Sequence, residues 1–328
     1  MASFTRRFVS SLGHKENVEQ VFLASDKQLR PNRNGNYYLQ VELSDRSGTI
    51  NARLWNASEG DYRAFENGDY VHVDGSTQIY QGTLQLIANR IRKADRSEVD
   101  EADFVTLSMP EIDRMAKRLA EILRQIRNPH LRNLAECFLM DDQFMRKFTQ
   151  APAGIKHHHA YHGGLLEHVV SLMELILRVA PCYKSLDQDL LLIGALTHDM
   201  GKVEELTYER DLAYSDPGQL LGHIVIGISM LDVKVREAEK LSGEAIPTAV
   251  VDQIKHMIVS HHGNYEYGSP KLPMTLEAVA LHHLDDMDAR LHNFESLMRD
   301  DANMDSNWTQ FQHNLGRKLY KGSSEKER

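Results

Sequence analysis

Cysteine is nearly absent from this sequence, which has only Cys137 and Cys182 in 328 residues. Two cysteines cannot build a disulfide framework or a thiolate zinc site. Both lie in helical patterns, so we expect buried free thiols and a cytoplasmic protein. Long apolar runs are absent too, since none approaches the roughly 20 residues that a membrane span needs. The N-terminal stretch MASFTRRFVSSLGHKENVEQ lacks the apolar core of a secretory signal. We therefore expect no membrane partner.

An excess of positive charge is also lacking, because the net charge is −9. This balance argues at first sight against a nucleic-acid partner, whose phosphates need Lys and Arg. The charge is uneven, however: residues 1–98 carry 13 basic and 12 acidic side chains, and the remainder carries 25 and 35. From His157 onward the chain holds 14 of the 17 histidines. An acidic, histidine-rich part could be acidic because it holds divalent cations, and bound metal would reverse the local field; composition alone permits this interpretation without establishing it.

The first part of the chain, about residues 15–93, alternates apolar and polar residues with a period of two. YYLQVELSD places Leu39, Val41 and Leu43 on one face and Tyr38 on the other. Turn residues separate about five such stretches, as in RPNRNGN, SDRSG and ENGD. Five short strands in some 80 residues favour a small closed barrel, with an OB-fold as the first candidate. A sandwich and an SH3-like barrel also fit this pattern.

The rest of the chain is predicted to be helical after a charged linker. Pro110 opens a helical pattern at its first position, PEIDRMAKRLAEILRQIRN. We expect domains at 1–95 (OB-fold) and 110–320 (helical), a linker at 96–109 and a disordered tail at 321–328. The further expected helices are 131–149, 163–180, 187–200, 217–241, 247–262 and 274–299, with a last one near 306–319.

Five of these helices each carry an imidazole or a carboxylate among apolar residues. These candidates are His168, the pair His198–Asp199 in LLIGALTHDMGK, His223, the pair His261–His262, and Asp285. A lone histidine in an apolar helix is more often a core residue than a ligand, but five such helices together are hard to explain in that way. Isolated buried charges are costly unless they are paired or bind a metal.

Imidazole and carboxylate ligands without cysteine favour Mn, Fe, Co, Ni or Zn in a catalytic rather than a structural site. Adjacent residues of a helix point about 100° apart. Asp199 could therefore bridge two metals while His198 binds one of them. Two such ions would activate a water for attack at phosphorus. Lys202, one turn after Asp199, could offset charge on a phosphate oxygen, although an ordinary lysine at a helix end also fits.

The ordered set H…HD-x-G-K…H…HH…D resembles the HD-domain metal-dependent phosphohydrolase superfamily. The segments HHHAYHGGLLEHV, GHIVIG, SHHGNYEYGSPKLPMTLEAVALHHLDDMDA and YLQVELSDRSGTINARLW are similar to the YhaM-type 3′–5′ exoribonucleases. That group joins an OB-fold to an HD domain, so the resemblance implies an OB-fold barrel followed by an all-α HD domain. The similarity extends from about residue 15 to 300.

The resemblance implies which residues do what. It assigns the metal ions to His168, His198, Asp199, His223, His261, His262 and Asp285, with Asp285 chosen over Asp286 and Asp288. Of the HH pair, at least one is a ligand, and the other could touch substrate. Lys202 matches the lysine of HD-x-G-K and is implied to contact the scissile phosphate, beside Asp199 as the other catalytic residue.

Six further residues are expected to contact substrate: His159, Tyr161, Lys271, Tyr38, Arg53 and Trp55. The first two border the implied site, with a solvated loop as the alternative, and Lys271 could equally be a surface lysine. Tyr38, Arg53 and Trp55 share the outward face of the barrel, with Arg30 and Arg33 in the neighbouring loop. Aromatic rings interleaved with arginine suit stacking on single strands. Trp55 could instead cover the barrel against the second domain.

The function that follows is a metal-dependent 3′–5′ exoribonuclease that degrades single-stranded RNA, or single-stranded DNA, to nucleoside 5′-monophosphates. Its expected cofactors are two divalent ions, manganese first and Co, Fe, Ni or Zn as alternatives. A phosphodiesterase or nucleotidase for small or cyclic nucleotides is the second hypothesis, because HD domains serve many such reactions. An OB-fold adaptor with a silent HD domain is the third. Oligomeric state stays open.

Overall fold

The computed structural model describes residues 6–32, 35–80, 82–155, 161–208, 212–299, 301, 303 and 306–322. Two compact units divide the chain. One holds Met1–Thr106 together with Phe294–Arg328, and the other holds Leu107–Asn293. The expected domain division differs at its C-terminal end, because residues after 293 group with the N-terminal unit instead of the helical one.

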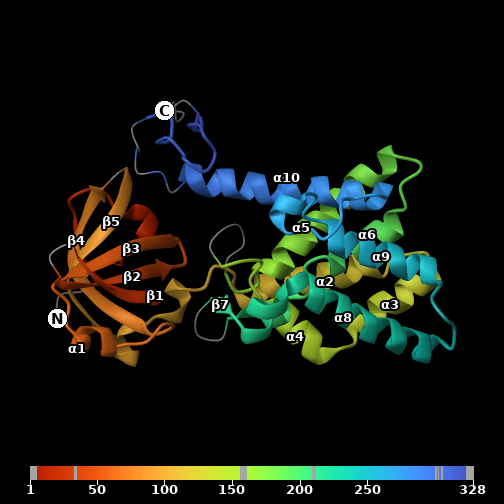
Figure 1. Ribbon diagram of the computed structural model, residues 1–328, viewed down its shortest axis with the longest axis horizontal. Helices are drawn as coiled ribbons and strands as arrows, with labels where there is room; N and C mark the ends of the chain where they lie inside the picture. Colours follow the sequence, from red (N-terminus) through yellow and green to blue (C-terminus); the bar gives the residue numbers. More distant parts are fainter. Residues whose placement is uncertain are drawn as a thin grey trace. The chain divides into compact units, whose positions relative to one another are not determined.

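Five strands form a closed barrel in the first unit (Figure 1). They are β1 (Asn17–Pro31), β2 (Tyr37–Asp45), β3 (Gly48–Trp55), β4 (Tyr70–Tyr80) and β5 (Thr83–Lys93). The order around the barrel is β1-β2-β3-β5-β4, with β3 and β5 parallel and the other pairs antiparallel. The short helix α1 (Glu59–Arg63) follows β3. This barrel confirms the expected OB-fold.

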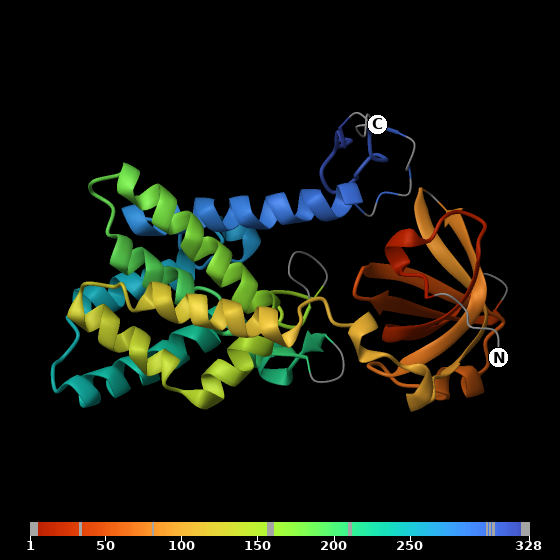
Figure 2. The ribbon, with the colours of Figure 1, turned by 180° about the vertical axis from the view of Figure 1, so that it is seen from behind.

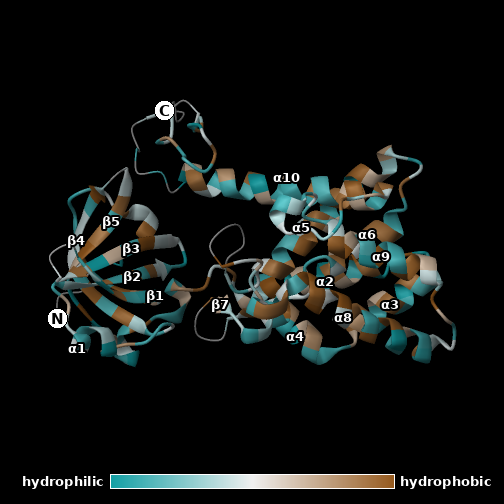
Figure 3. Ribbon diagram, viewed as in Figure 1, coloured by the Kyte–Doolittle hydropathy of each residue, from teal (hydrophilic) through white to brown (hydrophobic). Residues whose placement is uncertain are grey.

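The alternation of the sequence fixes the register of the barrel strands. Leu39, Val41 and Leu43 of β2 are buried, as are their partners in β3, and the residues between them face outward. Figure 3 shows the resulting change from hydrophobic to hydrophilic along each strand. Slipping a strand by one residue would move the whole apolar set to the surface. The register places Tyr38 opposite Trp55 on the outer face.

Helices make up most of the second unit (Figure 2). They are α2 (Met109–Leu123), α3 (Pro129–Leu139), α4 (Asp142–Gln150), α5 (Gly164–Val179), α6 (Gln188–Thr197), α7 (Lys202–Glu205), α8 (Asp216–Ser242), α9 (Thr248–Ser260) and α10 (Leu276–Arg299), which continues into the first unit. The short strands β6 (Leu206–Thr207) and β7 (Ala213–Tyr214) pair between α7 and α8. Every residue of α6 from Leu190 to Thr197 is buried, so the HD pair that follows it starts from the core.

Several expected details were wrong. The predicted helix 131–149 is two helices, because the Asp141 side chain accepts from the N–H groups of Gln143 and Phe144 and starts α4. The expected linker at 96–109 stays a prediction; its residues include two 3-10 turns and the first residue of α2. Cys137 is buried as expected, but Cys182 is exposed.

The last expected helix, 306–319, is also absent. Residues 306–322 form an irregular hairpin with two isolated antiparallel bridges, Trp308 to Tyr320 and Gln312 to Arg317. Gly316 at its turn has φ of 63°, a left-handed conformation that glycine adopts without strain. The turn reverses the chain where the apolar spacing had suggested a helix.

One described helix, α8, is long and apolar enough by composition to cross a membrane. It is weak evidence for a span, because core helices of globular domains pass the same test. Residues of α8 such as Leu231, Val235 and Ala238 pack into the helical core, and a kink at Gly222 interrupts its helical geometry.

Candidate metal centre

The apolar helix α6 ends at His198 and Asp199, and local hydrogen bonds fix how they point. His198 caps α6, and its Nδ1 donates to the carbonyl of Ala195 at 2.9 Å. A carbonyl only accepts, so the neutral ring keeps its lone pair on Nε2. His198 is fully buried and Asp199 is 4% exposed. The pair therefore presents an imidazole lone pair and a carboxylate to the interior of the unit.

Two glycines let α8 approach this turn. A Cβ on Gly201 would lie 2.0 Å from the carbonyl oxygen of His223, so only glycine fits. Gly222 has φ of 73° and kinks α8. After the kink, the N–H and the Nδ1 of His223 lie 2.9 and 3.0 Å from Oε1 of Glu205. The free Nε2 of His223 then lies 3.5 Å from Oδ1 of Asp199.

Two more histidines are held through the same ring nitrogen. His261 caps α9, and its Nδ1 donates to the carbonyl of Ile258 at 2.8 Å. The Nδ1 of His168 in α5 lies 2.9 Å from Oδ2 of Asp288, whose other oxygen accepts from Ser171 at 2.7 Å. Such partners set the tautomer and orientation of metal-binding histidines. Four rings thus direct Nε2 toward a shared centre.

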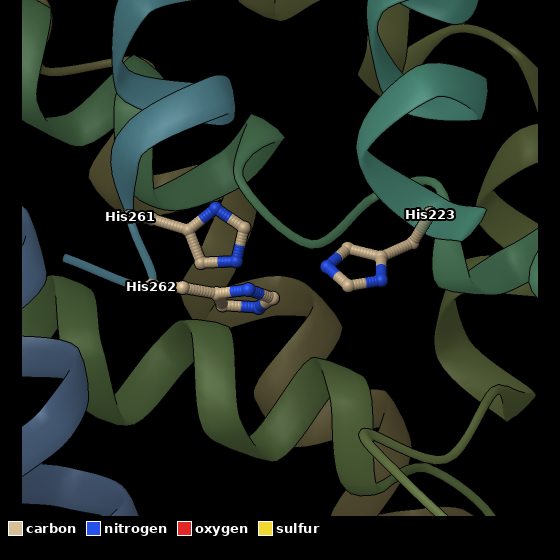
Figure 4. Close-up of side chains that lie close together, drawn as sticks. All are labelled: His223, His261 and His262. Atoms are coloured by element: carbon tan, nitrogen blue, oxygen red, sulfur yellow. The ribbon is translucent and has the colours of Figure 1, made fainter. Parts of the chain in front are cut away.

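The ligand atoms gather in two groups in which they lie within 4.8 Å of one another. The groups are His168, His198 and Asp285, and His223, His261 and His262. Figure 4 shows the second group, with the ring from α8 facing the two rings that follow α9. Asp199 contacts both groups: Oδ1 is 3.5 Å from Nε2 of His261, and Oδ2 is 3.5 Å from Nε2 of His198.

Buried polar atoms without partners test whether metal fits here. Asp199 Oδ1, His223 Nε2, His261 Nε2 and His262 Nδ1 are buried and have no hydrogen bond among the described residues. Leaving one such atom unsatisfied costs about 1–3 kcal/mol. Imidazole and carboxylate ligands suit borderline and hard divalent cations. The donor set therefore fits divalent metal.

The charges around His168 favour a cation. Burial lowers its pKa, but hydrogen bonds to Asp285 and Asp288, together with the charges of Asp285 and Asp199, outweigh burial and raise the pKa to about 10. Burial raises the pKa of Asp285, yet its hydrogen bond to His168 and the nearby His198 ring hold it below its usual range. The two carboxylates that favour a proton on His168 would equally favour a metal ion, which binds by displacing that proton.

The remaining groups are set for lone-pair donation. Burial lowers the pKa of His198 to about 4, and burial together with the neighbouring His261 lowers that of His262 to about 3. Both rings are therefore neutral at pH 7. Burial disfavours the charge on Asp199, but Lys202, whose Nζ lies 2.6 Å from Oδ2, keeps the pKa of Asp199 well below its usual range.

Comparison with known proteins agrees with this geometry. An OB-fold nucleic acid binding domain matches residues 23–94, and an HD domain matches residues 165–290. The 3′–5′ exoribonuclease YhaM of Bacillus velezensis is 35% identical over 277 residues, which is 84% of this chain and 86% of that protein. The chain belongs to the YhaM family. Its enzyme class, a hydrolase that acts on nucleic acid, agrees with the sequence prediction.

Two solved structures also match part of this family member. The second OB-fold domain of replication protein A from Methanococcus maripaludis is 18% identical, with 28% of this chain and 97% of that chain covered and a TM-score of 0.22. The mitochondrial single-stranded DNA binding protein Rim1 of S. cerevisiae is 20% identical, with coverages of 25% and 97% and a TM-score of 0.21.

The seven predicted metal ligands of this YhaM-family chain lie within the HD match, and six of them form the two groups around Asp199. An HD domain implies dependence on divalent metal. Among the three aspartates of α10, Asp285 Oδ1 is 3.2 Å from Nε2 of His168. Asp288 contacts the other ring nitrogen of His168, Nδ1, and Asp286 forms an ion pair with Arg290. The geometry therefore places Asp285 at the centre.

The predicted substrate residues lie in different places. His159 falls outside the described residues. The half-buried Tyr161 donates its hydroxyl hydrogen bond to Glu167. Lys271 is exposed in the segment that follows α9, and its backbone N–H donates to Val259. Tyr38, Arg53 and Trp55 share the outer face of the barrel. The roles of all six stay predictions.

The sequence analysis did not predict two residues that orient the ligand side chains. Glu205 holds His223, and Asp288 holds His168. Glu205 stands 18 positions before its partner and Asp288 stands 120 positions after its own. The one sequence signal for Glu205 is a carboxylate between apolar residues, as in KVEEL, which suggests a buried acidic side chain. Nothing in the spacing of the sequence connects it to His223.

Replacing Glu205 by glutamine should weaken divalent-metal affinity about 10-fold or more, because the His223 ring loses its charged acceptor. Calorimetric titration of metal-stripped protein with Mn²⁺ measures the change. Glu204→Gln is the matched control, since Glu204 pairs with Lys147 away from the ligands. Equal affinities of the two variants would show that Glu205 does not orient a ligand.

Proposed function

We propose that this protein is a metal-dependent exoribonuclease that removes nucleotides one at a time from the 3′ end of single-stranded RNA. The observation that carries the proposal is the Asp199 carboxylate, whose two oxygens contact two separate groups of ligand atoms. Membership in a 3′–5′ exoribonuclease family supplies the direction and the substrate class. The two free cysteines support a cytoplasmic location.

Two divalent ions per chain are proposed, with manganese as the first choice. His168, His198 and Asp285 would hold one ion, and His223, His261 and His262 would hold the other. Asp199 would give one oxygen to each. In two-metal sites the ions lie about 3.5–4 Å apart, which is a distance that one carboxylate can bridge. Thiolates take no part in either group, in agreement with a choice of Mn over a structural zinc.

Bound ions would acidify a water and offset charge on the phosphate oxygens. The water oxygen forms a new bond to the terminal phosphorus, and the bond from phosphorus to the O3′ of the preceding nucleotide breaks. The leaving O3′ takes a proton, and the last nucleotide departs as a 5′-monophosphate. Lys202 is largely buried beside Asp199; burial lowers its pKa, but Asp199, together with Asp285 and Glu205, outweighs burial and raises the pKa. Its charged ammonium would offset charge on a phosphate oxygen of the bound strand.

The outer face of the barrel would guide the strand. The rings of Tyr38 and Trp55 lie 5.1 Å apart across the β2–β3 pair. The Arg53 guanidinium lies 6.0 Å from the Trp55 ring and 5.9 Å from the ring of Tyr80, an exposed residue that the sequence analysis did not include. Bases of any sequence stack on such rings, and arginine adds charge for the backbone. The face supports a single-stranded nucleic acid as the substrate.

A 5′-labelled single-stranded RNA tests the proposal. With Mn²⁺ the purified protein should shorten it stepwise from the 3′ end and release nucleoside 5′-monophosphates. A strand of the same sequence in DNA, run beside it, measures the preference for ribose. RNA that stays intact with each of several divalent metals would refute the proposal. Turnover of small cyclic nucleotides alone would favour the second hypothesis.

A further inference from the structure

The C-terminal residues 306–322, drawn in dark blue in Figures 1 and 2, fold into an anchored hairpin. Asp301 is buried, and its carboxylate accepts from the N–H of Gln310 at 2.9 Å and from Nζ of Lys321 at 3.0 Å. Thr309 exchanges two hydrogen bonds with Leu319 across the hairpin. These contacts hold the two arms together, and Trp308, Phe311 and Tyr320 stay exposed.

The exposed side chains of this hairpin are aromatic and basic. Trp308 is 49% exposed and Tyr320 is 52% exposed, and their rings lie 5.0 Å apart across the bridge. Phe311 is also exposed. Residues 306–322 contain Arg317, Lys318 and Lys321 and no acidic residue, in a chain of net charge −9. A cluster of large apolar rings exposed to water often marks a surface that binds a partner.

The hairpin belongs to the same compact unit as the barrel. The Gln310 side chain lies against Gly82, where a Cβ would come within 2.3 Å of its Oε1. Gly82 stands two residues after Tyr80, the last residue of β4, whose ring lies beside Arg53. The hairpin is therefore in contact with the barrel turn that follows an aromatic residue of the outer face.

We propose that residues 306–322 form a second stacking surface for single-stranded RNA, with Trp308 and Tyr320 as its platform and Lys318 as a phosphate contact. The inference rests on the proposed function and extends it to a surface outside the barrel strands. Base stacking needs exposed rings, and phosphates need cations without neighbouring carboxylates. Trp308 and Tyr320 supply the rings. Lys318 supplies the cation, with no ion pair among the described residues, whereas Lys321 is paired with Asp301. A protein partner would also cover exposed rings, but the lack of any acidic side chain favours a polyanion.

Tryptophan fluorescence can observe this surface alone, because the chain has only two tryptophans, Trp55 and Trp308. In the full-length Trp55→Phe variant every tryptophan signal comes from Trp308. An RNA of about 20 nucleotides, with phosphorothioate linkages at its 3′ end to resist hydrolysis, should quench that signal in a saturable titration. An unchanged signal at saturating RNA, with binding confirmed by anisotropy of a labelled strand, would overturn the proposal.

Affinity gives the second test. Replacing Trp308 and Tyr320 together by alanine should weaken binding of the same RNA about 10-fold or more, and Trp308→Phe should keep most of the affinity. Lys318→Gln should reduce the slope of log K against log salt by about 0.7. The control is Tyr183→Ala, an exposed tyrosine of the helical unit. Loss of affinity with both alanine and phenylalanine would indicate a folding defect and contradict stacking.

Two further measurements separate the possible failures. Hydrolysis of bis(p-nitrophenyl) phosphate with Mn²⁺ tests the metal centre without RNA, and it should be the same in wild type and in the double alanine variant. Wild-type protein that degrades no RNA defeats the proposed function itself. Unchanged RNA affinity in the double variant, with a smaller assembly by light scattering, would assign the hairpin to protein contacts and overturn the RNA proposal alone.

Discussion

Asp199→Asn should lower kcat/KM for single-stranded RNA by at least about 10³-fold, which corresponds to about 4 kcal/mol of barrier. The amide keeps the shape of the side chain but has only one oxygen and no charge. It cannot join the two ligand groups that lie 3.5 Å from the oxygens of Asp199. Single-turnover kinetics with 5′-labelled RNA measure the loss, and elemental analysis should show fewer metal ions per chain.

The control for this variant is Asp216→Asn, an exposed aspartate in the first turn of α8. It should behave as wild type within about twofold. The asparagine at 199 also leaves the largely buried Lys202 without its partner, so circular dichroism must show that the variant is folded. A folded Asp199→Asn protein with activity close to wild type would contradict a bridging role.

Asp285→Asn should reduce kcat/KM by at least about 10²-fold, whereas Asp286→Asn should leave it within about twofold. The neighbours differ in what they contact. Asp285 lies beside the Nε2 atoms of His168 and His198, at 3.2 and 3.9 Å, and Asp286 forms an ion pair with Arg290. Both variants change an aspartate to asparagine in the same helix and are assayed with the same substrate. A difference between them therefore reports the effect of the position in the helix.

The affinity of these two variants for Mn²⁺ distinguishes a ligand from a residue that orients substrate. Asp285→Asn should lose metal in proportion to activity, because the carboxylate is proposed to contribute one oxygen directly. Equal metal content in the two variants, with activity lost only in Asp285→Asn, would show that Asp285 contacts the substrate and does not bind the metal. Loss of activity in Asp286→Asn alone would show that the assignment within α10 is wrong.

The predicted ligands of the centre stood out in the sequence because polar residues interrupt apolar helices there. His198 and Asp199 interrupt an apolar helix, and the buried environment of α6 makes that costly without a partner. The ligands come from separate helices. The sequence therefore shows their order along the chain, but it does not show that they lie close together in the fold. Only the fold shows that Asp199 stands between the two groups.

Where the prediction failed, tertiary contacts decided the structure. The segment 306–319 has helix-like apolar spacing, but Asp301 captures the Gln310 N–H and Lys321 and holds a hairpin instead. Glu205 and Asp288 could not be assigned as supports for ligands. The β6 and β7 strands and the start of α8 separate Glu205 from His223, and several helices separate Asp288 from His168. Tyr80 was missed because it ends β4 beside a turn, where the period-two pattern stops.

The central claim, that Asp199 joins two metal ions, is tested most directly by anomalous diffraction at the manganese edge. Crystals of wild-type protein with Mn²⁺ should show two peaks, one at His168, His198 and Asp285 and one at the group of His223, His261 and His262. One oxygen of Asp199 should face each peak. No peak at either group, or a single peak that Asp199 does not contact, would contradict the claim.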